Sequence, residues 1–200
     1  RVTIIFGEIS RGTPLLSVRK QPEQRWTLRR LYETGTLTEA ELQLIAEIFR
    51  QRKNFLVVGG TGSGKTAFLQ ALLELSPPDE RHVIIEDTQE LQPPNAASVT
   101  LLTRQDPARS VPEVGLEDLL KRALRLRPDR LVVGEIRGPE ATALLLALST
   151  GHAGSFGSLH AGSAAEALLR LEMLVQMGAP QWSLHSVRKL MAMTVGFILV

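Results

Sequence analysis

From residue 55 onward, short apolar runs alternate with amphipathic segments. The runs lie at residues 55–58, 83–85, 99–102, 131–133, 156–159 and 197–200. Between several of them, apolar residues recur at helical spacing, at residues 116–126, 141–148 and 164–177. Continuous apolar strands that alternate with helices are typical of a mostly parallel sheet that is covered on both faces. The pattern therefore predicts an α/β fold for this part of the chain.

Two short β-like runs precede this pattern, at residues 2–6 and 15–19, and a segment rich in turn-forming residues joins them. The polar residues 20–24 follow, and the proline among them marks the best candidate for a linker. The chain opens directly on a strand-like run without an initiator Met, which favours an excised piece of a longer protein. We expect the tail of a small α+β N-terminal domain, a linker and a C-terminal domain, at residues 1–20, 21–37 and 38–200.

Two helix starts can be recognised before the first strand of the α/β pattern. Thr27 is expected to cap a short helix that ends near Gly35. Thr38 and Glu41 have the spacing of a capping box, and apolar residues follow them at helical intervals. The sequence therefore predicts two helices in front of residue 55.

Composition is that of an ordinary folded domain. Apolar residues make up 44% of the chain and charged residues 22%, which argues against disorder. The net charge of +2, from 23 basic and 21 acidic residues, is not that of a protein with a broad basic face for nucleic acid. Cysteine is absent, which excludes disulfides and thiolate metal sites. No apolar run approaches the roughly 18 residues that cross a bilayer. The methionines are expected on helix faces in the core: Met173, Met177, Met191 and Met193.

The segment after the first apolar run carries the clearest chemical signal. Its sequence GGTGSGKT, at residues 59–66, matches the phosphate-binding pattern G-x-x-x-x-G-K-[ST], and a helical run follows at residues 67–75. The glycines let successive backbone N–H groups face a phosphate, and the helix N-terminus adds the positive end of its dipole. Lys65 is expected to reach the β- and γ-phosphates, and the Thr66 hydroxyl to ligate Mg²⁺. The predicted ATP-binding residues are Gly60, Thr61, Gly62, Ser63, Gly64, Lys65, Thr66 and Ala67.

A phosphate-binding loop does not identify the reaction, so the carboxylates that follow later strands matter. Gly134 and Glu135 end one apolar run, and Gly134 stands where many P-loop enzymes have Asp. The acid that supports the Mg²⁺ shell must then come from elsewhere. A second run ends in Glu86 and Asp87, and parallel strands present their C-terminal ends to one crevice. We expect Glu135 to orient or deprotonate the lytic water, and Glu86, with Asp87, to hold the Mg²⁺ hydration shell or polarise that water.

Four segments together resemble one family, the ATPases of type II and type IV secretion systems. They are GGTGSGKT, the acidic box IIEDTQEL, the atypical Walker B segment RPDRLVVGEIRGPEA and the histidine box TGHAGSFGSLHAGS, at residues 59–66, 84–91, 127–141 and 150–163. Their order and spacing also agree with the family. Within it, PPDERHVIIEDTQELQ and HAGSAAEALLRLEML look most like the CpaF-type tight-adherence pilus ATPases, although Gly162 stands where that branch usually carries Asn.

The resemblance implies a RecA-like core that hydrolyses ATP to ADP and phosphate and powers pilus assembly or protein secretion. It further implies a homo-hexameric ring, cytoplasmic and peripheral at the inner membrane. The implied partners are an integral membrane platform protein and pilus or secretion components, with no direct contact to nucleic acid. Residues 20–37 would form a hinge between the N-terminal remnant and the core.

The resemblance also suggests further catalytic residues. In such rings, arginines from the linker region or a neighbouring subunit approach the γ-phosphate, and the candidates are Arg19, Arg104 and Arg137. His160, together with His152, is expected to couple the nucleotide state to movement, because an imidazole near phosphate donates one hydrogen bond when neutral and two when charged.

Two other functions stay open at this point. A conjugation-type or helicase-like nucleic-acid motor shares the four segments. The near-neutral charge and the missing Asp before Glu135 argue against it, and Trp26 and Trp182 are isolated aromatics that form no base-stacking platform for a nucleic-acid strand. A regulatory nucleotide-binding module without turnover is the other alternative.

Overall fold

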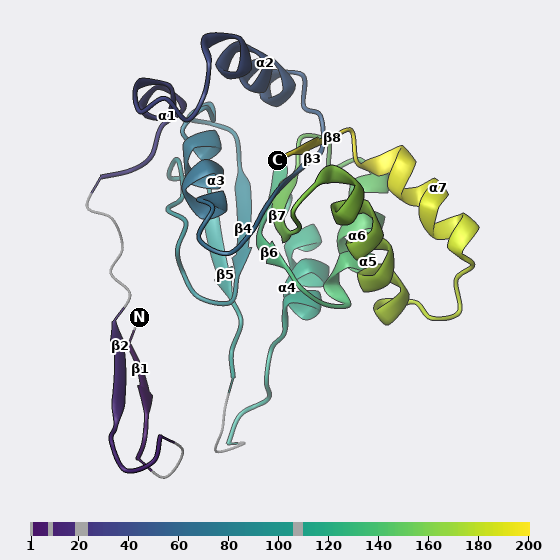
Figure 1. Cartoon of the computed structure of the whole chain (residues 1–200). Coiled ribbons are helices and arrows are strands. Elements are labelled where there is room, and N and C mark those ends of the chain that lie inside the picture. The colour runs from purple at the N-terminus through teal and green to yellow at the C-terminus, as the bar shows by residue number, and fades with distance from the viewer. Residues whose placement is uncertain (1, 8–9, 19–23, 106–109) are drawn as a thin grey trace.

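A parallel sheet of six strands is the centre of the computed structural model, which describes residues 2–7, 10–18, 24–105 and 110–200. The strand order is β5-β4-β6-β7-β3-β8, and every neighbouring pair runs parallel. Helices cover both faces of this sheet (Figure 1). The predicted α/β class with a mostly parallel sheet is therefore confirmed.

The strands coincide with the apolar runs. They are β3 (Phe55–Gly59), β4 (His82–Glu86), β5 (Val99–Leu102), β6 (Arg130–Ile136), β7 (Phe156–His160) and β8 (Phe197–Leu199). All of the predicted strands are present, and β6 continues beyond the predicted run through Gly134 and Glu135. The inner strands are almost wholly buried on both faces, which is why they are apolar runs and do not alternate with polar residues.

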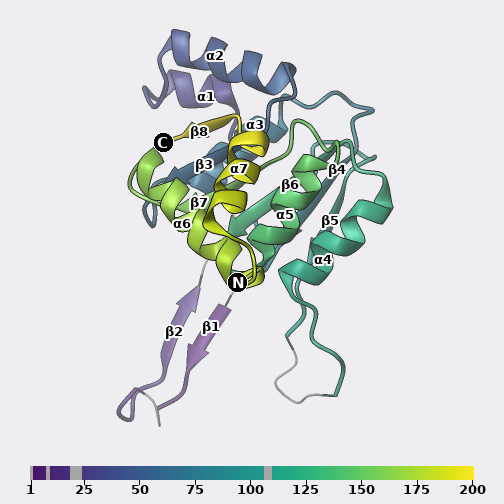
Figure 2. The same ribbon diagram turned by 90° about the vertical axis from the view of Figure 1, so that its right-hand side faces the viewer.

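Two hydrophobic clusters lie on opposite faces of the sheet. On one face, Val57, Ile84 and Val132 pack with α1 (Leu28–Glu33), α2 (Glu39–Arg50) and α3 (Lys65–Leu73). On the other face, their neighbours in each strand pack with α4 (Leu116–Ala123), α5 (Glu140–Ser149), α6 (Ala164–Gly178) and α7 (Leu184–Thr194) (Figure 2). A short 3-10 helix, η1 (Leu124–Leu126), follows α4. The alternation follows from the period of two in a strand, which turns successive side chains to opposite faces.

The N-terminal elements agree with the predicted ones. The strands β1 (Val2–Ile5) and β2 (Leu15–Val18) form an antiparallel pair. The Thr27 side chain accepts the N–H of Arg30 at the start of α1, and the capping box of Thr38 and Glu41 is formed. The predicted domain boundaries and the hinge stay predictions, and Arg19 with most of the predicted linker lies outside the described residues. Among the described residues, no helix combines the length and apolar character that a bilayer crossing requires.

The methionines of α6 and α7 correct one expectation. Met191 is buried, with 5% of its surface exposed, but the exposed fractions of Met173, Met177 and Met193 are 61%, 64% and 72%. The prediction of core positions was therefore wrong for these three. Helix α6 turns Ala167, Leu171, Leu174 and Val175 inward. Apolar residues continue around the helix onto its outer face, so helical spacing alone could not tell which row meets the sheet.

A buried ion pair lies at the end of the sheet where the strands begin. Arg130 and Glu80 are 3% and 5% exposed, and Arg130 Nε lies 2.9 Å from Glu80 Oε2. The guanidinium also donates to the carbonyl oxygens of Phe49 and Gly154, each at 3.0 Å. Because these partners satisfy the buried charge, Arg130 fixes the end of α2 against the starts of β6 and β7.

His82 begins β4 beside this pair, and its side chain is fully buried. Its Nε2 lies 3.1 Å from Ser76 Oγ, and its Nδ1 lies 3.2 Å from the carbonyl oxygen of Glu80. Burial lowers the pKa of His82, and the charge of Arg130 acts in the same direction, whereas Glu80 and Asp129 favour the charged form. The folded protein therefore holds His82 in its neutral state to a lower pH than the unfolded chain does.

The contribution of His82 to the stability of the protein should fall on acidification. An unfolded histidine has a pKa of about 6.5, so below that pH His82 is protonated in the unfolded chain and still neutral in the folded protein. Stability is thus lost from about pH 6.5 down to the lowered pKa of the folded state. We expect His82→Gln to remove this contribution, so that in denaturant titrations between about pH 7.5 and 5 its stability falls less, or rises more, than that of the wild type. The exposed His185→Gln should keep it, and an unchanged slope in His82→Gln would contradict the assignment.

Candidate functional site

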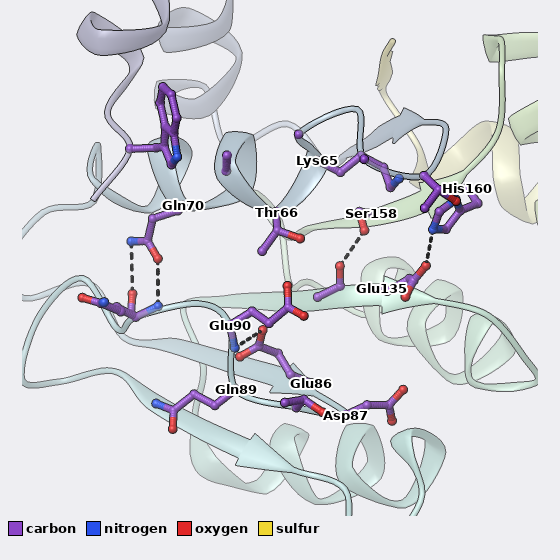
Figure 3. A pocket seen from close by; sticks show the side chains of 18 of the residues that line it. Lys65, Thr66, Gln70, Glu86, Asp87, Gln89, Glu90, Glu135, Ser158 and His160 are labelled. Carbon is purple, nitrogen blue, oxygen red and sulfur yellow. Dashed lines mark hydrogen bonds and ion pairs between the residues drawn. The ribbon is translucent and has the colours of Figure 1, made fainter. Parts of the chain in front are cut away.

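A cavity of about 540 Å³ opens where β3, β4, β6 and β7 end. Its walls come from the glycine loop and α3, from the end of β4 and the loop that follows it (residues 86–90 and 92), and from the ends of β6 and β7. Figure 3 shows Lys65, Thr66, Glu86, Glu135 and His160 around this space. The carboxyl ends of parallel strands are the usual place for a ligand crevice, and the predicted phosphate-binding and acidic residues meet there.

The glycine loop has the shape that phosphate binding requires. Gly62 and Gly64 have φ angles of +75° and +96°, in the left-handed region that favours glycine. Gly64 is also the N-cap of α3 and provides no side chain to cap the helix, so the amides of the first turn are left for a ligand. Lys65 Nζ donates to the carbonyl oxygens of Gly59 and Gly60, at 2.9 and 2.7 Å, and so lies over the loop. Burial lowers the pKa of Lys65, while the charge of Glu135 raises it.

Glu135 is held between an imidazole and a guanidinium at the rim of the sheet. Its Oε1 lies 2.7 Å from Nε2 of His160 (Figure 3). Its Oε2 lies 3.3 Å from Nε of Arg137. Arg137 also pairs with Asp87, which follows β4. Glu135 and His160 remain partly exposed, at 28% and 32% of their side chains. The carboxylate is therefore oriented from both sides and still accessible from the cavity.

An irregularity in β6 brings Glu135 into the cavity. Between Val133 and Ile136, β6 has one residue more than the paired segment of β7, which is the geometry of a β-bulge. Ile136 returns to the same core cluster as Val133, although regular alternation would put these two residues on opposite faces. Ser158 of β7 donates its hydroxyl to the carbonyl oxygen of Gly134, at 2.5 Å, and so stabilises the irregular segment.

Glu86 fills the space that a side chain at Gly134 would need. A Cβ built on Gly134 would lie 2.9 Å from Cγ of Glu86 and 3.3 Å from its Oε1. The Glu86 carboxylate is 4% exposed and accepts the N–H groups of Glu90 and Leu91, each at 3.1 Å. Burial raises the pKa of Glu86 to about 7. The neighbouring strand thus places a carboxylate beside the position that usually carries Asp, and the same carboxylate anchors the loop after β4.

The oxygen donors of the cavity fit a magnesium ion that arrives with a nucleotide. Thr66 and Glu86, the predicted metal residues, both line the cavity, and hydroxyl and carboxylate oxygens are the ligands that Mg²⁺ prefers. Among the described residues, no group of three or more His, Cys, Asp or Glu side chains could hold a metal by itself. Mg²⁺ commonly binds through one or two protein groups, water and substrate phosphates, so this sparse donor set agrees with a nucleotide-bound ion.

Only some of the predicted arginines and histidines lie at the cavity. Arg137 and His160 line the cavity. Arg104 folds back on its own loop, where it donates to the carbonyl oxygen of Pro112 at 2.6 and 3.1 Å, and it lines a separate hollow of about 380 Å³. His152 lies apart as well, with Nδ1 3.0 Å from the carbonyl oxygen of Ala147. The role of each stays a prediction, as does that of Arg19, which lies outside the described residues.

Several cavity residues were not predicted from the sequence. The cavity is also lined by Arg25, Trp26, Gln70 and Gln92. The Gln70 side chain forms two hydrogen bonds with the main chain of Gln92. Its Oε1 accepts the N–H at 2.8 Å, and its Nε2 donates to the carbonyl oxygen at 3.4 Å. Gln70 is only 7% exposed within a helix that is otherwise apolar on its buried side. A polar residue in such a run is the one signal that could have identified this wall, because buried carboxamides need partners.

Comparisons with known proteins agree with this geometry. The family described as type II/IV secretion system protein matches residues 7–195. A putative conjugal transfer protein of Mycobacterium tuberculosis is 42% identical over 187 residues, which are 93% of this chain and 53% of that protein. The probable conjugal transfer protein TrbB of Sinorhizobium fredii is 38% identical over 177 residues, 87% of this chain and 52% of the relative.

A solved structure extends the likeness to three dimensions. The VirB11 ATPase of the Brucella suis type IV secretion system, determined with sulphate, has a TM-score of 0.70 and 30% sequence identity. The match covers 90% of this chain and 53% of that one. This chain therefore spans about half the length of the relatives that it matches.

Proposed function

Because this chain belongs to the type II/IV secretion system protein family, we propose that it binds Mg-ATP and hydrolyses it as a motor subunit for pilus assembly or protein secretion. One observation carries the proposal: the glycine loop with Lys65, the bulged Glu135 and the inserted Glu86 all face a single cavity. The arrangement supplies phosphate binding, a base for water and an acid near the metal position, which are the parts that ATP hydrolysis requires.

The glycine loop and Lys65 would bind the phosphates. Lys65 would exchange the carbonyl oxygens of Gly59 and Gly60 for phosphate oxygens, since an ammonium gains more from an anion than from neutral carbonyls. The amides of Lys65, Thr66 and Ala67 at the start of α3 would donate to the same group. Mg²⁺, when bound, would neutralise phosphate charge, and Thr66 and Glu86 would hold it directly or through water.

Glu135 would orient the attacking water and accept its proton. His160 and Arg137 hold the carboxylate from two sides, which fixes its direction. Arg137 divides its guanidinium between Glu135 and Asp87, so its release from either partner would allow it to turn toward developing phosphate charge. Arg19 and Arg104 remain candidates for the same task from the N-terminal region or from a neighbouring subunit.

The setting of the activity is proposed at the family level. The subunits would form a hexameric ring at the cytoplasmic side of the inner membrane. Opening and closing of the cleft between the N-terminal region and the core would move a membrane platform protein and secretion components. The similar proteins are named for conjugal transfer and type IV secretion, which supports a secretion machine without selecting the tight-adherence branch. A nucleic-acid motor is not favoured, because the net charge is only +2 and the cavity, not a basic face, gathers the functional residues.

Phosphate release by the full-length protein tests the proposal. We expect turnover of ATP that needs Mg²⁺ and stops with a chelator, and sedimentation should detect ring formation with a non-hydrolysable ATP analogue. An assembled protein that binds ATP but releases no phosphate would contradict the motor and favour a regulatory module. Stimulation by single-stranded DNA with a steep salt dependence would instead favour the nucleic-acid motor.

A further inference from the structure

The cavity extends past the phosphate-binding loop to a wall of different chemistry. Thr66 and Gln70 both line it, and they lie one helical turn apart on α3, about 6 Å along the axis. The wall at the Gln70 end is completed by Arg25 and Trp26, from the segment just before α1. One end of the cavity is therefore rich in charged groups, and the other offers an aromatic ring and carboxamides.

Trp26 is held in place from several directions. The guanidinium of Arg30 lies 4.5 Å from the centroid of its ring, so a cation covers one face of the indole. The ring is partly buried and packs against the core cluster that contains Leu28 and Leu69. The next residue, Thr27, caps α1 with its side chain, which fixes the backbone beside the indole. An aromatic ring that is immobilised in this way loses little entropy when a ligand packs against it.

A hydrogen-bonded network joins the Trp26 segment to the rest of the wall. Arg25 pairs with Glu74, the C-cap of α3, at 3.3 Å and donates from Nε to Oε1 of Gln92 at 2.5 Å. Gln92 is itself bound through its main chain to Gln70 of α3. The network therefore connects the segment before α1, helix α3 and the loop after β4 on one side of the cavity. It keeps Trp26 at a constant position relative to the helix whose first turn carries the phosphate-binding amides.

We propose that Trp26 binds the nucleobase of the nucleotide by stacking, so that the cavity recognises a nucleoside triphosphate and not only its phosphates. The inference rests on the proposed function, because it needs the phosphates at the glycine loop. Every nucleobase has a π-face, and stacking on an aromatic side chain contributes about 1–3 kcal/mol per base. Trp26 lines the cavity, whereas Arg30, which lies against its ring, is not one of the lining residues. Trp26, an isolated aromatic in the sequence, lines the nucleotide cavity and would contact the base.

Tryptophan fluorescence can isolate this contact. The chain has two tryptophans, and Trp182 packs with the opposite core cluster and is not part of the cavity wall. In the Trp182→Phe variant of this chain, ATP should change the emission of Trp26, whereas inorganic tripolyphosphate should leave it unchanged while competing with ATP in calorimetry. If ATP binds by calorimetry and the emission stays constant, the stacking is refuted and the proposed function survives. If neither ligand binds, the proposed function fails, and the inference fails with it.

Substitution of Trp26 gives a second, independent measurement. Trp26→Ala should weaken ATP binding roughly 5- to 150-fold, which corresponds to the loss of one stacked base. Trp26→Phe should recover most of that loss, because a phenyl ring still stacks. Affinity for tripolyphosphate should be the same in all variants, since the glycine loop is untouched. An equal loss of affinity for ATP and tripolyphosphate in Trp26→Ala would show that the indole only supports the fold, and would overturn the proposal.

Discussion

Glu135→Gln should remove most ATP turnover and leave nucleotide binding intact. The amide cannot accept a proton from the attacking water, and a positioned general base contributes about 10²- to 10⁴-fold to a rate. The amide oxygen can still accept from Arg137, and the amide nitrogen can donate to Nε2 of a neutral His160, so the bulge of β6 should keep its shape. Steady-state phosphate release should therefore fall by this factor, while the dissociation constant for ATP changes little.

A matched variant separates this effect from a general loss of charge. Glu47→Gln removes a carboxylate that pairs with Arg50 on the surface of α2, away from the cavity, and should retain the wild-type rate. Full hydrolysis by Glu135→Gln would refute the assignment of Glu135 as the base. Loss of ATP binding in that variant would indicate a structural role for the carboxylate instead.

The sequence was most informative where one physical cause determines the pattern. The strands could be placed because both faces of a parallel sheet are buried, which leaves a continuous apolar run such as residues 83–85. The glycine loop could be placed because phosphate binding demands left-handed backbone at Gly62 and Gly64 and a cation after them. In both cases a local structural requirement determines which residue types can stand at consecutive positions.

Features that depend on contacts between distant segments could not be derived in this way. The bulge that redirects Glu135 involves Ser158 on another strand, and strict alternation along β6 would have pointed Glu135 toward the helices that cover Val133. The cavity position of Trp26 likewise depends on how Arg25 reaches α3 and the loop after β4. Nothing in the spacing of these residues along the chain indicates such pairings.

The relation between Gly134 and Glu86 leads to the other large expected effect. In Gly134→Asp, the new Cβ would lie 2.9 Å from Glu86 Cγ, so one of the two side chains must leave the site. Displacement of Glu86 would deprive the amides of Glu90 and Leu91 of their acceptor, at a cost of about 1–3 kcal/mol for each buried group. We expect Gly134→Asp to lose most turnover and to unfold at lower denaturant concentration than the wild type.

The double variant Gly134→Asp/Glu86→Ala distinguishes the two tasks of Glu86. It removes the crowding and returns one carboxylate to the same space from the adjacent strand, as in P-loop enzymes with Asp at this position. If Glu86 supports the Mg²⁺ shell, turnover should recover relative to both single variants, and the Mg²⁺ concentration for half-maximal rate should return toward the wild-type value. Gly134→Asn/Glu86→Ala has the same shape without the charge and should not recover. Equal recovery in both double variants, or in neither, would mean that Glu86 acts by anchoring the loop after β4 and not as a carboxylate near the metal.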